Sequence, residues 1–179
     1  MGANDGDSDE SPIHEVAVAE FRMDLTEVTV AAYRACVDAK KCSAPDTFHA
    51  ACNWGRAGQD RHPVNCVTWD QAREFCNWAG KSLPTEAQWE YAARGTDGRT
   101  YPWGNDEPTN RACWLRREWR GTCEVGSFSP GDSPFGVKDM AGNVFEWTES
   151  HYSENYSKPR DVDARVIRGG TWGDLTRDI

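Results

Sequence analysis

Two carboxylates lie on either side of a glycine-containing turn in the stretch FGVKDMAGNVFEW. Asp139 comes before Gly142 and Asn143, and Glu146 follows them. Ca²⁺ takes carboxylate and backbone carbonyl oxygens as ligands. A glycine lets the main chain curl so that such oxygens converge on one point. The spacing therefore indicates a clasp for a hard cation, and the alternative is a turn with two solvated or ion-paired acids.

Cysteine is abundant in this chain and offers a second kind of chemistry. The seven cysteines stand at positions 36, 42, 52, 66, 76, 113 and 123. This number favours disulfides and an oxidising compartment, periplasmic or extracellular, and an odd count leaves at least one cysteine outside an internal pair. Cys36 with Cys42, and Cys113 with Cys123, are close enough to close small loops. A zinc site is the rival interpretation, although there is no CxxC pair and the four histidines are scattered.

The composition describes one acidic, loop-rich domain. With 179 residues, nine tryptophans, 16 glycines and only 38% hydrophobic residues, large aromatic side chains are expected to pin a fold with little regular secondary structure. The net charge of −9 argues against binding to nucleic acid or to an anionic membrane. No apolar run approaches the roughly 18 residues of a membrane span, so no membrane insertion is expected.

The chain is divided into a short lead and a single domain. Residues 1–12 are predicted to be a flexible acidic N-terminal segment, and residues 13–179 to form the domain. The alternation of Val16 and Val18 with polar or small residues in HEVAVAEFRMD predicts a first strand. Near the other end, RVIRGGTW predicts a buried strand that runs into a glycine turn.

Three helices are predicted, each after a threonine that suits an N-cap: Thr29, Thr68 and Thr85. A glutamine three positions after the second and third threonines completes a capping box, and Gly80 and Gly95 follow as stop signals. The expected buried positions are Val30, Tyr33 and Val37 in the first helix, Ala72, Phe75, Cys76 and Ala79 in the second, and Trp89, Ala92 and Ala93 in the third.

Two irregular regions remain. Residues 43–65 have no periodicity, which predicts a long loop with Cys52 and Cys66 as candidates for a staple. In WLRREWRG, the arginines and tryptophans suit recognition of an anion or an aromatic group, and the alternative is a solvated loop. These residues are Trp114, Arg116, Arg117, Trp119 and Arg120.

Long strings of the sequence resemble the family of formylglycine-generating enzymes and sulfatase-modifying factors. They are EVTVAAYRACV, HPVNCVTWDQAREFCNWAGKSLPTEAQWEYAARG, FGVKDMAGNVFEWTES and RVIRGGTW, in the family's order. The resemblance covers the whole chain and implies an α+β, C-type-lectin-like fold with few helices and short antiparallel strands. The family's closing strand is missing after Ile179, so we expect the domain to be incomplete at its C-terminus.

The resemblance also implies a copper chemistry whose ligands this sequence lacks. Family members that act as oxidases bind Cu(I) through two cysteines, five positions apart, that follow the RGG motif, and they oxidise a substrate cysteine to formylglycine with O₂. Soft thiolates select Cu(I). At the two positions this chain has Asp174 and Ile179. Copper is therefore not expected, no catalytic residue is assigned, and the chain is expected not to be an enzyme.

The calcium clasp fits the family better. The resemblance implies a structural Ca²⁺ held by the Asp139 side chain, the Gly142 and Val144 carbonyls and the Glu146 carboxylate, and all four positions match in type. A second family calcium site is not expected: Asn110 suits its first part, but RGTCEVGSF lacks the required aspartate. A disulfide between Cys113 and Cys123 is a candidate to close that loop instead.

These features favour a non-catalytic, calcium-stabilised recognition or accessory module. Its expected partner is a protein or peptide, or other domains of a longer chain, including a kinase. The alternative is a formylglycine-generating oxidase whose catalytic residues lie outside this chain. An iron-dependent, sulfoxide-forming relative is a further alternative, but it requires a His-rich helical partner domain that this sequence does not contain.

Overall fold

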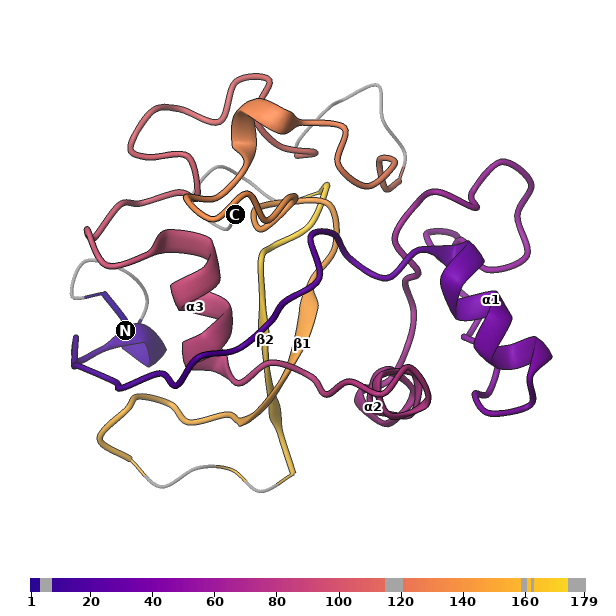
Figure 1. The fold of residues 1–179 in the computed structure, drawn as a ribbon, viewed down its shortest axis with the longest axis horizontal. Coiled ribbons are helices and arrows are strands. Elements are labelled where there is room, and N and C mark those ends of the chain that lie inside the picture. The colour runs from indigo at the N-terminus through magenta and orange to yellow at the C-terminus, as the bar shows by residue number, and fades with distance from the viewer. Residues whose placement is uncertain (4–7, 115–120, 159–160, 162, 174–179) are drawn as a thin grey trace.

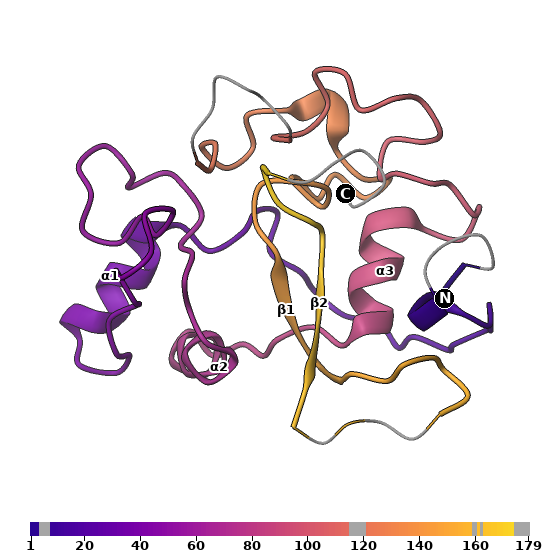
Figure 2. The ribbon, with the colours of Figure 1, turned by 180° about the vertical axis from the view of Figure 1, so that it is seen from behind.

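Two short antiparallel strands lie in the middle of the molecule, with helices on both sides (Figure 1 and Figure 2). The computed structural model describes residues 1–3, 8–114, 121–158, 161 and 163–173. Strand β1 spans Glu146–His151 and β2 spans Arg165–Arg168. Glu146 pairs with Arg168 in the ladder. The strand predicted in RVIRGGTW is therefore confirmed, and Glu146 of the expected clasp begins β1.

All three predicted helices are present: α1 over Val30–Asp38, α2 over Trp69–Trp78 and α3 over Glu86–Arg94. Each predicted threonine caps its helix by accepting a backbone N–H with its side chain, and the capping boxes of α2 and α3 both form. Two 3₁₀ turns, Ser8–Glu10 and Ser129–Gly131, complete the described helical elements. The predicted caps identified the start of each helix because the capping interaction is local.

Helix α3 packs against both strands and carries one of two small apolar cores. Trp89, Ala92 and Ala93 are buried as predicted, and they cluster with Val137 and Met140. The buried carboxylate of Glu86, in the first turn of α3, accepts a hydrogen bond from the Arg168 guanidinium at the end of β2. This ion pair fixes the start of the RGG turn relative to α3.

Helices α1 and α2 enclose the second core. Tyr33 of α1 stacks on Phe75 of α2, with ring centroids 5.5 Å apart, and both side chains are buried. The predicted inner face of α2 is only partly correct, because Ala79 is exposed. Ala79 is the C-cap residue of α2, where the chain turns away through Gly80 at a φ of 71°.

The predicted first strand is wrong. Around Val16 and Val18 the described chain forms no ladder, and Val16 is exposed. This segment crosses the middle of the molecule on its way to α1 (Figure 1), and its later residues Phe21 and Met23 pack against the α3 core. The apolar alternation therefore reflects packing of an extended chain, which needs no neighbouring strand edge.

The lead before this segment makes specific contacts. The backbone N–H of Gly2 donates to the Glu90 carboxylate of α3 at 3.0 Å, and Ala3 donates to the Glu10 carbonyl at 2.9 Å. Residues 4–7 lie outside the described part of the chain. The flexibility expected of residues 1–12 stays a prediction.

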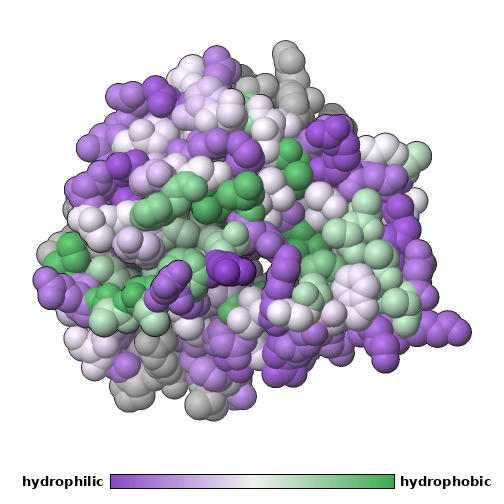
Figure 3. All heavy atoms as spheres, viewed as in Figure 1, coloured by the Kyte–Doolittle hydropathy of each residue, from purple (hydrophilic) through white to green (hydrophobic). Residues whose placement is uncertain are grey.

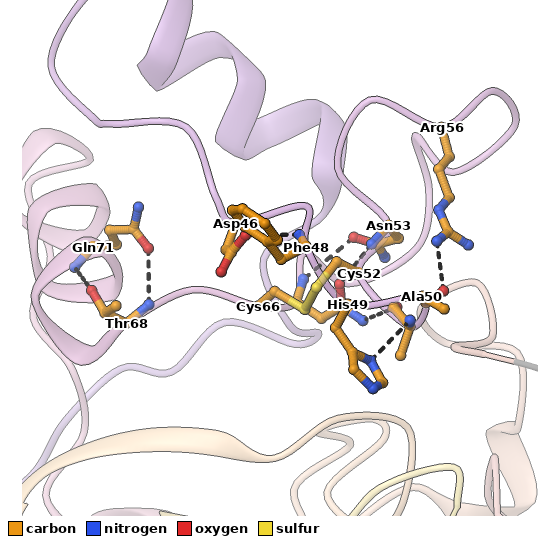
Figure 4. Close-up of a disulfide and its surroundings, with 12 residues drawn as sticks. Asp46, Phe48, His49, Ala50, Cys52, Asn53, Arg56, Cys66, Thr68 and Gln71 are labelled. Carbon is orange, nitrogen blue, oxygen red and sulfur yellow. Dashed lines mark hydrogen bonds between the residues drawn. A yellow bond between two sulfur atoms is a disulfide. The ribbon is translucent and has the colours of Figure 1, made fainter.

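Three disulfides join the cysteine pairs that the spacing suggested: Cys36–Cys42, Cys52–Cys66 and Cys113–Cys123. Three disulfides fit an oxidising compartment. In the long loop, the Cys52–Cys66 bond lies beside hydrogen bonds made by Asp46, His49 and Asn53 (Figure 4). The predicted loop is thus held by covalent and polar links in place of regular secondary structure.

The surface is mostly hydrophilic, although apolar residues gather in a broken band across the face shown in Figure 3. Large exposed apolar side chains include Ile13, Leu25 and Phe48. Among the helices of the described residues, none combines the length and the apolar character that a bilayer span requires.

The cysteine pairing makes a direct prediction about thiol chemistry. All seven cysteines are described, and Cys76 on α2 is the one outside a disulfide. Burial, and then the charge of Asp24, raises the pKa of the Cys76 thiol, which lowers its thiolate fraction at pH 8.

We expect iodoacetamide to label one cysteine per unreduced chain, more slowly in the folded than in the urea-denatured protein, as followed by mass spectrometry. Cys76→Ser is the control and should take no label. More than one label in the unreduced chain would contradict the pairing.

Candidate functional site

The turn between Asp139 and Glu146 has a backbone that few residues tolerate. Asp139, Gly142 and Asn143 all have positive φ, at 55°, 81° and 62°. A Cβ at Gly142 would lie 2.5 Å from the Cys113 carbonyl oxygen, so a side chain there would collide with backbone. The sequence folds this way because Gly, Asn and Asp are the residues that best accept the left-handed conformation.

Asn143 anchors this turn with all of its polar groups. Its backbone N–H donates to the Cys113 carbonyl at 2.8 Å, and its carbonyl accepts from the Trp172 N–H at 3.1 Å. Its side-chain Oδ1 accepts from the Cys123 N–H at 2.9 Å, and Nδ2 donates to Glu27 Oε1 at 2.8 Å. The residue is fully buried. Asn143 therefore fixes the turn against the Cys113–Cys123 disulfide, the RGG turn and the segment before α1.

The two predicted acids accept hydrogen bonds from neutral donors, and Asp139 is buried whereas Glu146 is half-buried. Asp139 Oδ2 accepts from the Gly126 backbone N–H, and Glu146 Oε2 accepts from Trp89 Nε1–H at 3.1 Å. Burial is the main cause that raises the pKa of the Asp139 carboxyl, and it raises the pKa of Glu146 to about 7. Both groups thus stand where carrying a negative charge is costly unless a cation compensates it.

The predicted carbonyl donors lie on the same turn. A Cβ built on Gly169 would be 3.6 Å from the Val144 carbonyl oxygen and 3.9 Å from Glu146 Oε1, so these two oxygens face the same glycine. Gly142 donates its N–H to the Gly169 carbonyl at 2.6 Å. Within the described residues, the carbonyl oxygens of Gly142 and Val144 accept no hydrogen bond. They keep lone pairs that are available to a ligand.

A third acid, which the sequence did not single out, faces the same place. The pKa of Glu27 is raised well above its ordinary value by burial and then by the charges of Asp139 and Glu146. Its Oε2 is buried and has no hydrogen-bond partner among the described residues. The only signal in the sequence was its place in EVTVAAYRACV, a string that carried the family resemblance without a role for the glutamate.

The outcome for the other predicted residues is mixed. Asp174, Ile179 and the loop positions Arg116, Arg117, Trp119 and Arg120 lie outside the described residues. Trp114 is described, and its Nε1–H donates to the Pro108 carbonyl at 3.2 Å. Across the described ranges, no group of three or more His, Cys, Asp or Glu residues is arranged to hold a metal ion. A cation at this turn therefore depends on carbonyl oxygens as well as on carboxylates.

Comparison with known proteins assigns the family. A model of the sulfatase-modifying factor enzyme 1-like domain matches residues 1–179. The chain belongs to this family. A solved structure, PvdO from Pseudomonas aeruginosa, superposes with a TM-score of 0.79 at 29% identity, covering 99% of this chain and 80% of that one. Treponema denticola variable protein 1 gives a TM-score of 0.64 at 25% identity, over 85% of this chain and 73% of that one. The predicted α+β, C-type-lectin-like fold is thereby confirmed.

The relatives of this chain include one protein named as an inactive formylglycine-generating enzyme and one named as a formylglycine-generating enzyme. The inactive C-alpha-formylglycine-generating enzyme 2 of Bos taurus is 42% identical over 123 residues, or 63% of this chain and 39% of the relative. A formylglycine-generating enzyme of Streptomyces coelicolor is 32% identical over 225 residues, covering 91% of this chain and 71% of that protein. The chain thus spans about two fifths of the bovine relative's length.

A third relative is a kinase. The serine/threonine-protein kinase pkn1 of Chlamydia pneumoniae is 32% identical over 207 residues, which cover 99% of this chain but 32% of the kinase. A domain of this family therefore also occurs as a part of longer chains.

The four hydrogen bonds of Asn143 predict a large loss of stability on truncation. Asn143→Ala leaves the Cys123 N–H and the Glu27 carboxyl without their partner and places alanine at a positive φ. Two unsatisfied buried groups and the strain together destabilise by on the order of 3 kcal/mol. We expect the melting temperature to fall by about 6–12 °C in calorimetry. Asn77→Ala, at an exposed position of α2, is the matched control and should change it little. Equal melting temperatures for the two variants would contradict this role of Asn143.

Proposed function

We propose that this chain is a non-catalytic, calcium-stabilised module with a recognition or accessory role in a longer protein. The observation that carries the proposal is the turn at residues 139–146, which bears two carboxylates with neutral donors and two carbonyl oxygens that accept no hydrogen bond within the described residues. These are hard oxygen donors, and buried acids of this kind are stabilised by a hard cation.

The donor set suits Ca²⁺ better than other common ions. Asp139 and Glu146 would supply carboxylate oxygens, and Gly142 and Val144 carbonyl oxygens, without any thiolate or imidazole. Bound Ca²⁺ would offset the negative charge of the two acids. The buried Oε2 of Glu27 supports the fit, because this oxygen has no partner among the described residues and the other oxygen of the same carboxyl is bound to Asn143 of the turn.

The state of the cysteines supports a non-catalytic role. Six of the seven form disulfides, and the free Cys76 lies on α2 with Asp24 and Lys81 as charged neighbours. The two positions that bear copper-binding thiolates in the family's oxidases are Asp174 and Ile179 here. The bovine relative that is named as inactive also supports a non-catalytic role.

The partner is proposed to be a protein or peptide, or another domain of the same longer chain. The chlamydial kinase supports the second choice, since nearly the whole of this chain matches a third of that protein. The alternative function is a formylglycine-generating oxidase, and the Streptomyces relative of that name, matched over 91% of this chain, favours it.

Removal of calcium tests the structural half of the proposal. A ligand at 100 times its Kd stabilises the native state by about 2.7 kcal/mol, so EDTA should lower the melting temperature by about 5–10 °C. Glu146→Gln keeps an acceptor for Trp89 but loses a charged ligand, and it should reproduce most of the loss without chelator. Glu149→Gln, an exposed position on the same strand, is the control. A melting curve that EDTA leaves unchanged would overturn the calcium site.

Copper binding tests the catalytic half. Without a thiolate pair, we expect no stoichiometric Cu(I) binding in competition with a colorimetric chelator, and no oxidation of a cysteine-containing peptide by O₂. The unreduced chain with Cys76→Ser should be used, so that the free thiol does not bind the metal. The Streptomyces coelicolor formylglycine-generating enzyme is the positive control. Turnover by this chain would favour the oxidase.

A further inference from the structure

Glu27 lies in a segment whose backbone is fixed on both sides. The carbonyl of Leu25 accepts the Lys138 N–H at 2.8 Å, and the carbonyl of Val28 accepts the Val64 N–H at 2.9 Å. Thr29 then caps α1. The Glu27 side chain therefore leaves a short stretch that is held between the turn region on one side and the disulfide-linked loop on the other.

The Glu27 carboxyl has one satisfied and one unsatisfied oxygen. Oε1 accepts from Asn143 Nδ2 at 2.8 Å, whereas Oε2 is buried without a partner among the described residues. A buried carboxylate oxygen without a donor is costly unless a positive charge compensates it. Asn143, which holds Oε1, lies between Gly142 and Val144 in the chain, so the side chain with the unpaired oxygen is bound directly to the candidate turn.

Among the described residues, no side-chain cation donates a hydrogen bond to the three acids, although the charge of Lys138 opposes the rise in the pKa of the Asp139 carboxyl. The donors that reach the three acids are the Gly126 N–H, the Trp89 indole and the Asn143 amide, all neutral. Lys138 is adjacent in sequence to Asp139, but its Nζ pairs with Asp132 at 2.7 Å. The three acids therefore have no directly bonded side-chain cation among the described residues, and a bound metal ion would supply positive charge there.

We propose that Glu27 is the third acidic component of the calcium site. It is a positioning residue that orients Asn143 and adds a negative charge to those of Asp139 and Glu146. This inference rests on the proposed calcium site and extends it to a residue 116 positions away from Asn143 in sequence. Glu27 acts through its neighbours, because the described residues contain no group of three acids arranged to hold a metal directly.

A variant with one changed group separates this role from a purely structural one. Glu27→Gln keeps an oxygen to accept from Asn143 and replaces the unpaired, ionisable oxygen with a neutral NH₂. We expect calorimetric titration with CaCl₂ to give a Kd at least tenfold weaker than that of the unmodified chain. In EDTA, the same variant should melt at the same temperature or higher, because the repulsion among the acids is reduced.

Two further variants complete the test. Glu20→Gln removes a charge from an exposed position of the same N-terminal stretch, and its Kd should stay within twofold of the unmodified value. Glu27→Asp keeps the charge on a shorter side chain, and its Kd should lie between those of the unmodified chain and the Gln variant. If Glu27→Asp binds no better than Glu27→Gln, the charge is not what Glu27 contributes and the inference is overturned.

The outcomes distinguish failure of the role proposed for Glu27 from failure of the calcium site itself. If the unmodified chain binds calcium and Glu27→Gln binds it equally well, the role of Glu27 is overturned while the calcium site stands. If Glu27→Gln melts lower than the unmodified chain in EDTA and binds calcium with the same Kd, Glu27 is a structural residue only. If the unmodified chain itself does not bind calcium, the proposed function fails first, and the inference fails with it.

Discussion

A buried asparagine in a left-handed conformation is the constraint on which the site depends. Asn143 links the Cys113–Cys123 disulfide, the segment that carries Glu27 and the turn at Trp172 through four hydrogen bonds. Few other residues combine tolerance of positive φ with a side chain that both donates and accepts. The turn is therefore determined by one residue's chemistry, and the oxygens on either side of it take their positions from that residue.

The same arrangement creates an electrostatic problem. In and beside the turn, the Asp139, Glu146 and Glu27 carboxyls accept hydrogen bonds from neutral donors, and the charges of Asp139 and Glu146 contribute to the raised pKa of Glu27. In a low-dielectric environment such acids take up protons or a cation. A fold with short strands and two small cores has little apolar burial to offset this cost. Its three disulfides and the proposed ion would then have related roles, since both hold loops that regular secondary structure does not.

Local features of the fold could be predicted from the sequence, and distant contacts could not. Threonine caps and closely spaced cysteines act within a few residues, so the starts of α1, α2 and α3 and the short disulfide loops were foreseen. The strand expected around Val16 was wrong, because alternation does not tell whether a partner strand exists. Glu27 was missed for a related reason: its role depends on Asn143, 116 positions later in the chain.

The turn at residues 139–146 packs directly beside the RGG motif. The Gly142 N–H donates to the Gly169 carbonyl, and the Val144 carbonyl and Glu146 carboxylate face Gly169, whose lack of a side chain leaves that space open. Arg168, just before, is paired with buried Glu86. The turn and the RGG strand end therefore form one packed unit. Loss of the turn would release the strand end whether or not a cysteine pair followed it, so the contacts of the turn serve the fold and are no argument for catalysis.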